Sequence, residues 1–154
     1  MKINNCPQVQ NQAFISFEDL NFLIDSDCVA VIDARSGLEI NEEKISEDKK
    51  MIPNALSIPV EDIELVDDAG YFYEDFDSQD LLLDYEDQIK TINYISSLPR
   101  SATYIVYCGS KECDKSENLA YYLINNFKFS NVAIYKGGWE EWKEWEEWKE
   151  KVND

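Results

Sequence analysis

Hydrophobic residues along this chain occur in two patterns, short continuous runs and longer segments with helical spacing. Continuous runs of strand-forming residues are typical of strands that are buried on both faces of a sheet. Such runs occupy residues 28–35 ("CVAVIDAR"), 103–108 ("TYIVYC") and 131–138 ("NVAIYKGG"), with a shorter one at 55–60 ("ALSIPV"). Each run is predicted to form a strand.

Segments with one apolar face lie between and around these runs, and their spacing predicts helices. They cover residues 16–25 ("SFEDLNFLID"), 79–98, 116–127 ("SENLAYYLINNF") and 139–152 ("WEEWKEWEEWKEKV"). Ser16 is expected to cap the first helix. The second helix is expected to end before Pro99, and its apolar residues with helical spacing are Leu82, Leu83, Ile89, Ile92 and Ile95.

Strands separated by helices predict an α/β fold with an open, mainly parallel sheet and helices on both faces. The chain of 154 residues is interpreted as one domain, with a core at about 15–145 and an extended N-terminal arm at 1–14. The charged residues 41–50 are predicted to form an exposed loop, and residues 61–78 a short helix followed by a loop. Functional sites in such folds lie beyond the carboxyl ends of the strands.

The composition excludes several classes of function. A net charge of −18 would repel nucleic acids and anionic membrane surfaces. The absence of histidine removes catalytic triads, histidine metal sites and histidine general bases. Without a long apolar run or an apolar signal segment, the chain is predicted to be cytoplasmic. The alternative is a periplasmic or membrane-tethered protein from which an N-terminal segment has been removed.

The four cysteines, Cys6, Cys28, Cys108 and Cys113, are too few for a disulfide-rich scaffold in a chain that can build a core. Cys108 and Cys113 together would supply only two metal ligands, so no metal site is predicted. No organic cofactor is implied either. Any chemistry is therefore expected from the side chains of the protein itself.

The candidate chemistry lies at Cys108, where the strand at 103–108 ends and a polar loop leads into a helix. Backbone N–H groups at a helix start lack partners within the helix, so they can hold an anion and lower the pKa of a nearby thiol. The resulting thiolate is a nucleophile, whereas the simpler interpretation of Cys108 is a small buried hydrophobic residue. The predicted substrate-binding residues are those of the loop, Gly109, Ser110, Lys111, Glu112, Cys113, Asp114, Lys115 and Ser116.

Four residues outside the loop are expected to support it. Asp33 and Arg35 end a buried strand near the site, where a structural ion pair is the simpler interpretation and substrate contact is the alternative. Gly137 and Gly138 are expected to permit a tight turn from strand to helix near the cysteine loop.

Four tryptophans, Trp139, Trp142, Trp145 and Trp148, recur every three residues, so they cannot all face one core. The first two are expected to pack on the domain. The last two either form an exposed apolar patch for a partner or a second copy, or pack back on the domain surface.

These motifs, taken in order, resemble the rhodanese-like domain family. The segment "VAVIDARSGLE" is similar to a family strand that ends in Asp-x-Arg, and "MIPNALSIP" to the segment before a short apolar strand. "YIVYC", with Ser116 at the helix start, resembles the catalytic strand and loop. "NVAIYKGGWEEW" is similar to the closing strand, a Gly-Gly pair and a tryptophan at Trp142. The resemblance covers about residues 15–145.

The resemblance implies a single-domain sulfurtransferase. Cys108 would take the outer sulfur of thiosulfate or of another sulfane donor as a persulfide, and a thiol or cyanide would accept that sulfur. The loop amides from Gly109 to Ser116 would hold the persulfide and the anionic donor. Lys115 stands where many members of the family have an arginine. The implied partners are a small sulfur-containing anion and a thiol acceptor.

Two features of the loop leave alternatives open. Six residues separate Cys108 from Lys115, which is longer than the common family pattern. A lysine cannot grip phosphate through two parallel hydrogen bonds, as the arginine of the related phosphatases does. Cys113 could resolve a sulfenic acid or a persulfide into an internal disulfide. The alternatives to sulfur transfer are therefore a catalytically weak binding module and a thiol-redox protein that uses Cys108 and Cys113.

Overall fold

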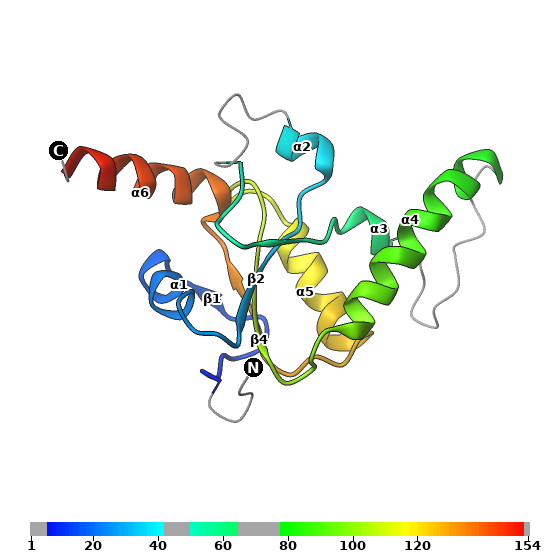
Figure 1. Ribbon diagram of the computed structural model, residues 1–154, viewed down its shortest axis with the longest axis horizontal. Helices are drawn as coiled ribbons and strands as arrows, with labels where there is room; N and C mark the ends of the chain where they lie inside the picture. The colour runs from blue at the N-terminus through cyan, green and yellow to red at the C-terminus, as the bar shows by residue number, and fades with distance from the viewer. Residues whose placement is uncertain (1–5, 42–49, 65–77, 153–154) are drawn as a thin grey trace.

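The computed structural model describes residues 6–41, 50–64 and 78–152 (Figure 1). In this part of the chain, one parallel sheet has the strand order β1-β5-β4-β2-β3. The strands are β1 (Phe14–Ile15), β2 (Val29–Asp33), β3 (Leu56–Ser57), β4 (Thr103–Tyr107) and β5 (Val132–Tyr135). The helices are α1 (Phe17–Leu23), α2 (Gly37–Asn41), α3 (Glu61–Glu64), α4 (Ser78–Ser97), α5 (Lys115–Asn125) and α6 (Gly138–Val152). The predicted α/β class is confirmed.

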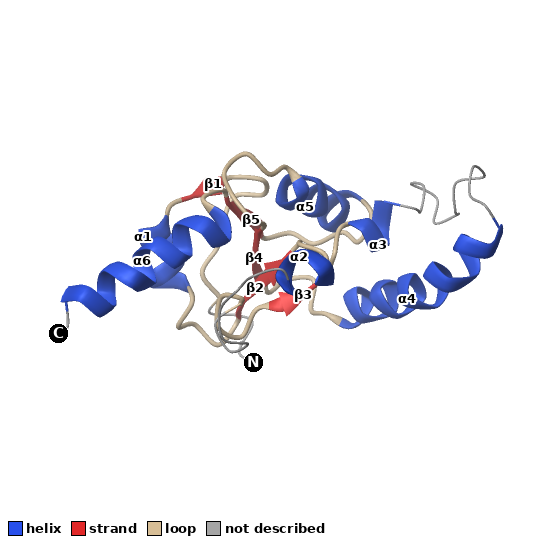
Figure 2. Cartoon of the chain, turned by 90° about the horizontal axis from the view of Figure 1, so that it is seen from above, coloured by secondary structure: helices blue, strands red, loops and turns tan. Residues whose placement is uncertain are grey.

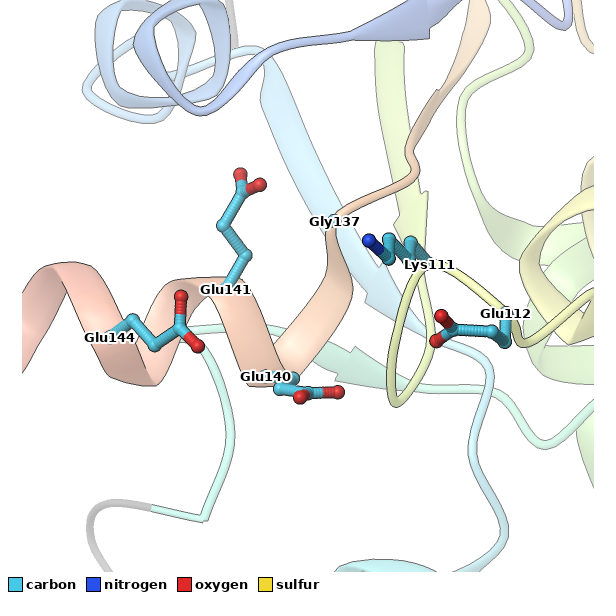
Figure 3. A pocket seen from close by; sticks show the side chains of 6 residues that line it. All are labelled: Lys111, Glu112, Gly137, Glu140, Glu141 and Glu144. Atoms are coloured by element: carbon cyan, nitrogen blue, oxygen red, sulfur yellow. The ribbon is translucent and has the colours of Figure 1, made fainter.

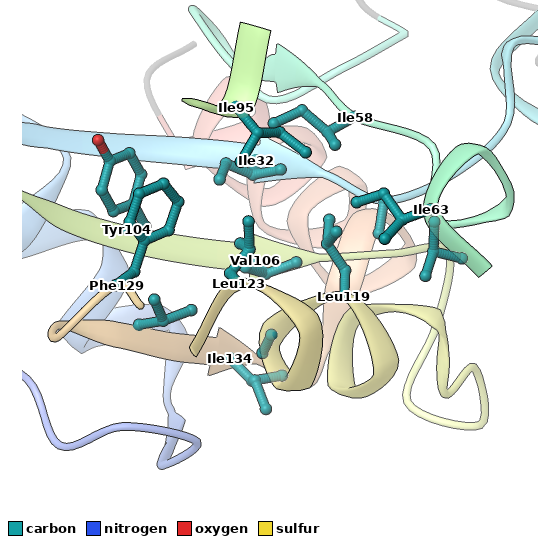
Figure 4. Packing of buried hydrophobic residues seen from close by; sticks show 14 of the residues in the cluster. Ile32, Ile58, Ile63, Ile95, Tyr104, Val106, Leu119, Leu123, Phe129 and Ile134 are labelled. Carbon is teal, nitrogen blue, oxygen red and sulfur yellow. The ribbon is translucent and has the colours of Figure 1, made fainter. Parts of the chain in front are cut away.

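Helices cover both faces of the sheet (Figure 2), because successive strand residues point to opposite sides. On one face, Ile32, Val106 and Ile134 from three neighbouring strands pack in a buried cluster with α5 (Figure 4). Leu119 and Leu123 supply the α5 side of this cluster, and neither has measurable exposure. The apolar spacing predicted for residues 116–127 is therefore the face that α5 buries.

The opposite face of the sheet packs against α1 and α6. Val31, Ile105 and Ala133, each next to a residue of the first cluster, belong to a second buried cluster. Leu20 of α1 and Trp139 of α6 join it. Two buried faces explain why the central strands are apolar along their whole length.

The central strands end side by side, and this sets the position of the candidate site. β2 and β4 pair in register from Val29 with Thr103 to Asp33 with Tyr107. All five residues of β4 are buried. Cys108 follows Tyr107 directly, so its backbone leaves the sheet at the carboxyl edge, between β2 and β5.

Two short local signals in the sequence define helix starts. Ser16 caps α1 as predicted, because its Oγ accepts a hydrogen bond of 3.1 Å from the backbone N–H of Asp19. Helix α2 was not predicted, yet Ser36 and Glu39 form a capping box. The N–H of Glu39 donates to Ser36 Oγ at 3.2 Å, and the N–H of Ser36 donates to Glu39 Oε1 at 3.3 Å.

The apolar face predicted for the second long helix is only partly buried. Ile95, near the C-terminal end of α4, has no measurable exposure, whereas Ile89 is 37% exposed. The predicted helix is present and ends before Pro99. Its N-terminal half projects away from the sheet (Figures 1 and 2). The side chains of Leu82 and Leu83 lie outside the described residues, as do residues 42–49 and 65–77 of the two predicted loops.

The tryptophans of α6 divide as their spacing predicts. Trp139 and Trp142 are buried. Trp145 packs back on the domain, because its ring stacks on Phe17 of α1 with 4.6 Å between centroids. Trp148 is 54% exposed and meets Trp145 edge-on. Of the two alternatives for the last two tryptophans, packing on the domain holds for Trp145, whereas Trp148 is exposed.

The segment before β1 lies against the amino ends of the central strands. A disulfide joins Cys6 to Cys28, just before β2, and the Cα atoms are 5.6 Å apart. Both residues are buried. The side chain of Asn11 accepts a hydrogen bond of 2.8 Å from the N–H of Val132. No described helix has the length and apolar character needed to cross a membrane.

The Cys6–Cys28 disulfide is expected to stabilise the fold, because it restricts the unfolded chain across a separation of 22 residues. Cys6→Ala should lower the free energy of unfolding by about 3 kcal/mol on the loop-entropy account. Chemical denaturation without reductant measures this difference. With reductant present, the free energy of unfolding of the wild type should fall to that of the variant. Equal values for the two proteins in oxidising buffer would contradict the disulfide.

Candidate active site

Cys108 lies buried at the carboxyl end of β4, beside the first turn of α5. Its side chain is almost fully enclosed, with 1% of the residue exposed. Its Sγ lies 3.5 Å from the Oγ of Ser116 and 3.4 Å from the carbonyl oxygen of Cys113. The strand thus fixes the sulfur atom, and the helix start provides its polar surroundings.

Cys113 is paired with Cys108 in a disulfide across the loop. The two Cα atoms are 6.4 Å apart, within the range that disulfides span. The loop folds back through a turn in which the N–H of Cys113 donates to the carbonyl of Ser110 at 3.1 Å. Cys108 is buried, whereas Cys113 is partly exposed. The structure therefore represents an oxidised state, in which Cys108 has no free thiol.

Helix α5 points its N-terminus at this pair. Asp114 occupies the N-cap position, and its side chain makes no capping hydrogen bond. Ser116 in the first turn is buried beside Cys108. First-turn amides of a helix carry partial positive charge and stabilise a nearby anion. The described geometry therefore suits a thiolate or a persulfide at Cys108.

Lys115 does not face Cys108 as a free cation. Its ammonium forms ion pairs with Glu39 of α2 and Glu61 of α3. Burial alone would lower the pKa of Lys115, but hydrogen bonds to both carboxylates outweigh it and the pKa is raised. Lys115 thus remains charged while tying three helices together at the rim of the site.

Lys136, at the end of β5, also contacts the loop, and the sequence reading missed it. Its Nζ donates to the carbonyl oxygen of Cys113 at 3.2 Å and forms an ion pair with Glu117 of α5. The contact fixes the backbone of Cys113 from the side of the sheet. Lys136 directly precedes Gly137 and Gly138, which were expected near the cysteine loop, so its place in the sequence was a usable signal.

Asp33 and Arg35 form a buried network below the loop. The Arg35 guanidinium binds both carboxylate oxygens of Asp33, at 2.8–3.2 Å, and donates to the carbonyl of Lys50 at 2.8 Å. The Tyr107 hydroxyl donates to Asp33 at 2.7 Å and accepts from the N–H of Ile52 at 3.1 Å. Burial, followed by the charge of Asp33, raises the pKa of Tyr107. These contacts support the structural role predicted for the ion pair.

The turn into α6 closes over the start of the loop. Gly138 has φ +68°, a conformation that favours glycine, and a Cβ there would lie 2.5 Å from the carbonyl oxygen of Cys108. The N–H of Trp139 donates to that oxygen at 2.8 Å, and the N–H of Glu140 donates to the carbonyl of Gly109 at 2.9 Å. The tight turn predicted at Gly137 and Gly138 is therefore present, and it holds the backbone of Cys108.

A shallow hollow lies outside the loop, towards α6 (Figure 3). Its lining residues are Lys111, Glu112, Gly137, Glu140, Glu141 and Glu144. Four carboxylates against one ammonium make this surface unfavourable for an anion. The outer hollow therefore does not suit the predicted anionic substrate.

The loop residues predicted to bind substrate thus separate into groups. Cys113 and Ser116 face Cys108, and Lys111 and Glu112 line the outer hollow. Gly109 accepts a hydrogen bond from Glu140 of α6, and Lys115 pairs with carboxylates. Ser110 accepts a turn hydrogen bond within the loop, and Asp114 accepts one from Asn118 of α5. The binding roles of all eight stay predictions. No group of three or more potential metal ligands occurs among the described residues.

Comparison with known proteins gives the same fold. Residues 16–144 match the family model of the rhodanese-like domain. SSP1007 from Staphylococcus saprophyticus has a TM-score of 0.51 at 18% identity, over 84% of this chain and 92% of its own. BH2092 from Bacillus halodurans has a TM-score of 0.52 at 21% identity, over 86% and 72%. No curated protein sequence matches the chain.

A third similar structure is a tyrosine-to-alanine variant of EanB in complex with ergothioneine. Its TM-score is 0.52 at 19% identity, and the match covers 80% of this chain. The chain spans about a quarter of EanB, 24% of its length. Another EanB structure holds ergothioneine covalently linked with a cysteine persulfide. At these identities the similarities establish the fold alone.

Gly138→Ala tests the clamp between the α6 turn and the loop. The left-handed backbone alone should cost about 1–2 kcal/mol of unfolding free energy, and the contact with the Cys108 carbonyl should add to this loss. Gly37→Ala is the matched control, because no atom lies within 4 Å of a Cβ there. Chemical denaturation compares the two variants. Equal stabilities would contradict the clamp.

Proposed function

The chain belongs to the rhodanese-like domain family, and we propose that it is a sulfurtransferase that carries a sulfane sulfur on Cys108. The observation that carries this proposal is the position of Cys108, buried at the end of β4 with its Sγ 3.5 Å from Ser116 at the start of α5. A rigid strand places the nucleophile, and a helix N-terminus stabilises its anionic forms.

The transfer begins with the reduced loop. The Cys108 thiolate attacks the outer sulfur of thiosulfate, the sulfur–sulfur bond of the donor breaks, and sulfite leaves with the electron pair. The product is a persulfide on Cys108. A thiol or cyanide then attacks the outer sulfur and regenerates the Cys108 thiolate. The same scheme applies to a persulfide donor, whose leaving group is a thiolate.

The chemistry needs no general base if the thiolate is already present near neutral pH. Helix N-termini lower the pKa of cysteine thiols enough for this. The chain contains no histidine, so activation by the α5 amides is the route the described residues support. The step requires no metal and no organic cofactor.

The acidic surface favours one class of donor over another. A net charge of −18 and the carboxylates of the outer hollow oppose the approach of a dianion such as thiosulfate. A persulfide, which carries less negative charge, meets less repulsion. We therefore propose a persulfide as the physiological donor and thiosulfate as a slower substitute in assays.

The disulfides bear on the compartment in which the protein works. Disulfides persist in oxidising compartments and are rare in the cytosol. The Cys6–Cys28 disulfide is buried and lies at the amino end of β2, whereas the cysteine loop lies at the carboxyl end of the sheet. We propose a periplasmic or similar oxidising location, the alternative to the cytoplasmic location predicted from the sequence.

Dithiol–disulfide exchange without sulfur transfer is the second candidate function, favoured by the pairing of Cys108 with Cys113. It uses the same two thiols but predicts that the reduced protein gains no sulfur from a sulfane donor. Sulfur loading therefore separates the two candidates.

The sulfurtransferase proposal predicts where sulfur will be found. Reduced Cys113→Ser, incubated with thiosulfate, should gain the mass of one sulfur atom on Cys108 and release an equal amount of sulfite. Reduced Cys108→Ser should gain none, because Cys113 lies outside the buried position beside α5. Intact and peptide-resolved mass spectra measure both. Sulfur on Cys108→Ser, or no sulfur on Cys113→Ser from either thiosulfate or a persulfide donor, would refute the carrier role.

A further inference from the structure

Sulfur transfer to an external acceptor requires no second cysteine, although the fold holds the backbone of Cys113 in a defined position. A turn to Ser110 and the hydrogen bond from Lys136 both fix its backbone. The Cα atoms of Cys108 and Cys113 are 6.4 Å apart, and the two side chains are joined. The site therefore contains its own thiol within bonding distance of the sulfur carrier.

We propose that Cys113 is the resolving thiol of the reaction, which displaces the sulfane sulfur from Cys108, and that the domain thereby reduces sulfane sulfur to hydrosulfide. This inference rests on the proposed function, because it requires a persulfide on Cys108. The reductant is an external dithiol, such as a small dithiol or a dithiol protein, which restores the loop after each turnover. The disulfide state described above is then the product of the reaction.

The step balances in atoms and electrons. The Cys113 thiolate attacks the Sγ of the Cys108 persulfide, a bond forms between the two cysteine sulfur atoms, and the persulfide bond breaks. The outer sulfur leaves as hydrosulfide with the electron pair. The external dithiol then reduces the Cys108–Cys113 disulfide through a mixed disulfide and is itself oxidised to a disulfide. Thiosulfate and a dithiol thus give sulfite, hydrosulfide and a disulfide.

The geometry favours attack on the inner sulfur atom of the persulfide. The pairing of the cysteines means that Cys113 can reach Cys108 Sγ with the backbone in its observed position. Ser116 and the first turn of α5 face that same sulfur. Attack on this inner sulfur expels the outer sulfur, whereas attack on the outer sulfur would only move the persulfide to Cys113.

The different exposure of the two cysteines determines which sulfur atom of the loop disulfide the external dithiol attacks. Cys108 is 1% exposed, whereas Cys113 is partly exposed, so an external dithiol attacks Cys113. Cys108 then leaves as a thiolate beside the α5 N-terminus, which stabilises it. Reduction therefore restores the nucleophile directly.

Single turnover without free thiol tests the inference, because an added thiol would itself release hydrosulfide from a persulfide. The protein is reduced, freed of reductant and mixed with thiosulfate under anaerobic conditions. Sulfite, hydrosulfide and the state of each cysteine are then measured. The wild type should release sulfite and hydrosulfide in equal amounts and end as the Cys108–Cys113 disulfide. The rate constant for hydrosulfide release should not depend on protein concentration.

Cys113→Ser should release the same amount of sulfite, keep the sulfur on Cys108 and lose hydrosulfide release altogether. Cys6→Ala is the matched control, since it removes a thiol remote from the loop and should behave as the wild type. If the wild type keeps its sulfur on Cys108, as Cys113→Ser is expected to do, the proposed role of Cys113 is refuted but sulfur transfer is not. Absence of sulfite from both proteins, together with no sulfur on Cys108 of Cys113→Ser from a persulfide donor, overturns the proposed function as well.

Discussion

The hold on the backbone of Cys108 is the constraint on which the rest of the site depends. β4 delivers this residue between its two neighbouring strands, and the N–H of Trp139 binds its carbonyl oxygen at 2.8 Å. Gly138 is needed for this approach, because any Cβ would strike the same oxygen. The backbone is held from the α6 side, and the sulfur atom lies on the other side, 3.5 Å from Ser116 Oγ at the start of α5.

The charges around the loop are balanced rather than left free for substrate. Lys115 is paired with Glu39 and Glu61, and Lys136 with Glu117. With these two lysines paired, we propose that the positive character that an anionic sulfur species meets beside Cys108 comes from backbone amides of α5. This division leaves the ammonium groups to fix the loop, in particular the backbone of Cys113.

Sequence periodicity was sufficient to predict the fold class, because a strand buried on both faces is apolar along its whole length. It also located Cys108, because the strand ends where polar residues begin. It did not show how much of α4 is buried, because helical spacing alone does not reveal which part of a helix packs on the sheet; Ile95 has no measurable exposure, whereas Ile89 is 37% exposed. Helix α2 had a readable signal in Ser36 and Glu39. Lys136 had an indirect one, because it adjoins the glycine turn expected near the loop. The Cys6–Cys28 bond had none, because it depends on how the segment before β1 folds against the sheet.

The central claim is that Cys108, once freed from Cys113, takes the outer sulfur of a donor. Thiosulfate labelled with a heavy isotope only at its outer sulfur tests this most directly, with reduced protein compared against protein whose loop disulfide is closed. The account predicts unlabelled sulfite and labelled sulfur on Cys108 or in hydrosulfide from the reduced protein, and no reaction from the closed form. Label recovered only in unreacted thiosulfate, or equal labelling of both forms, would contradict it.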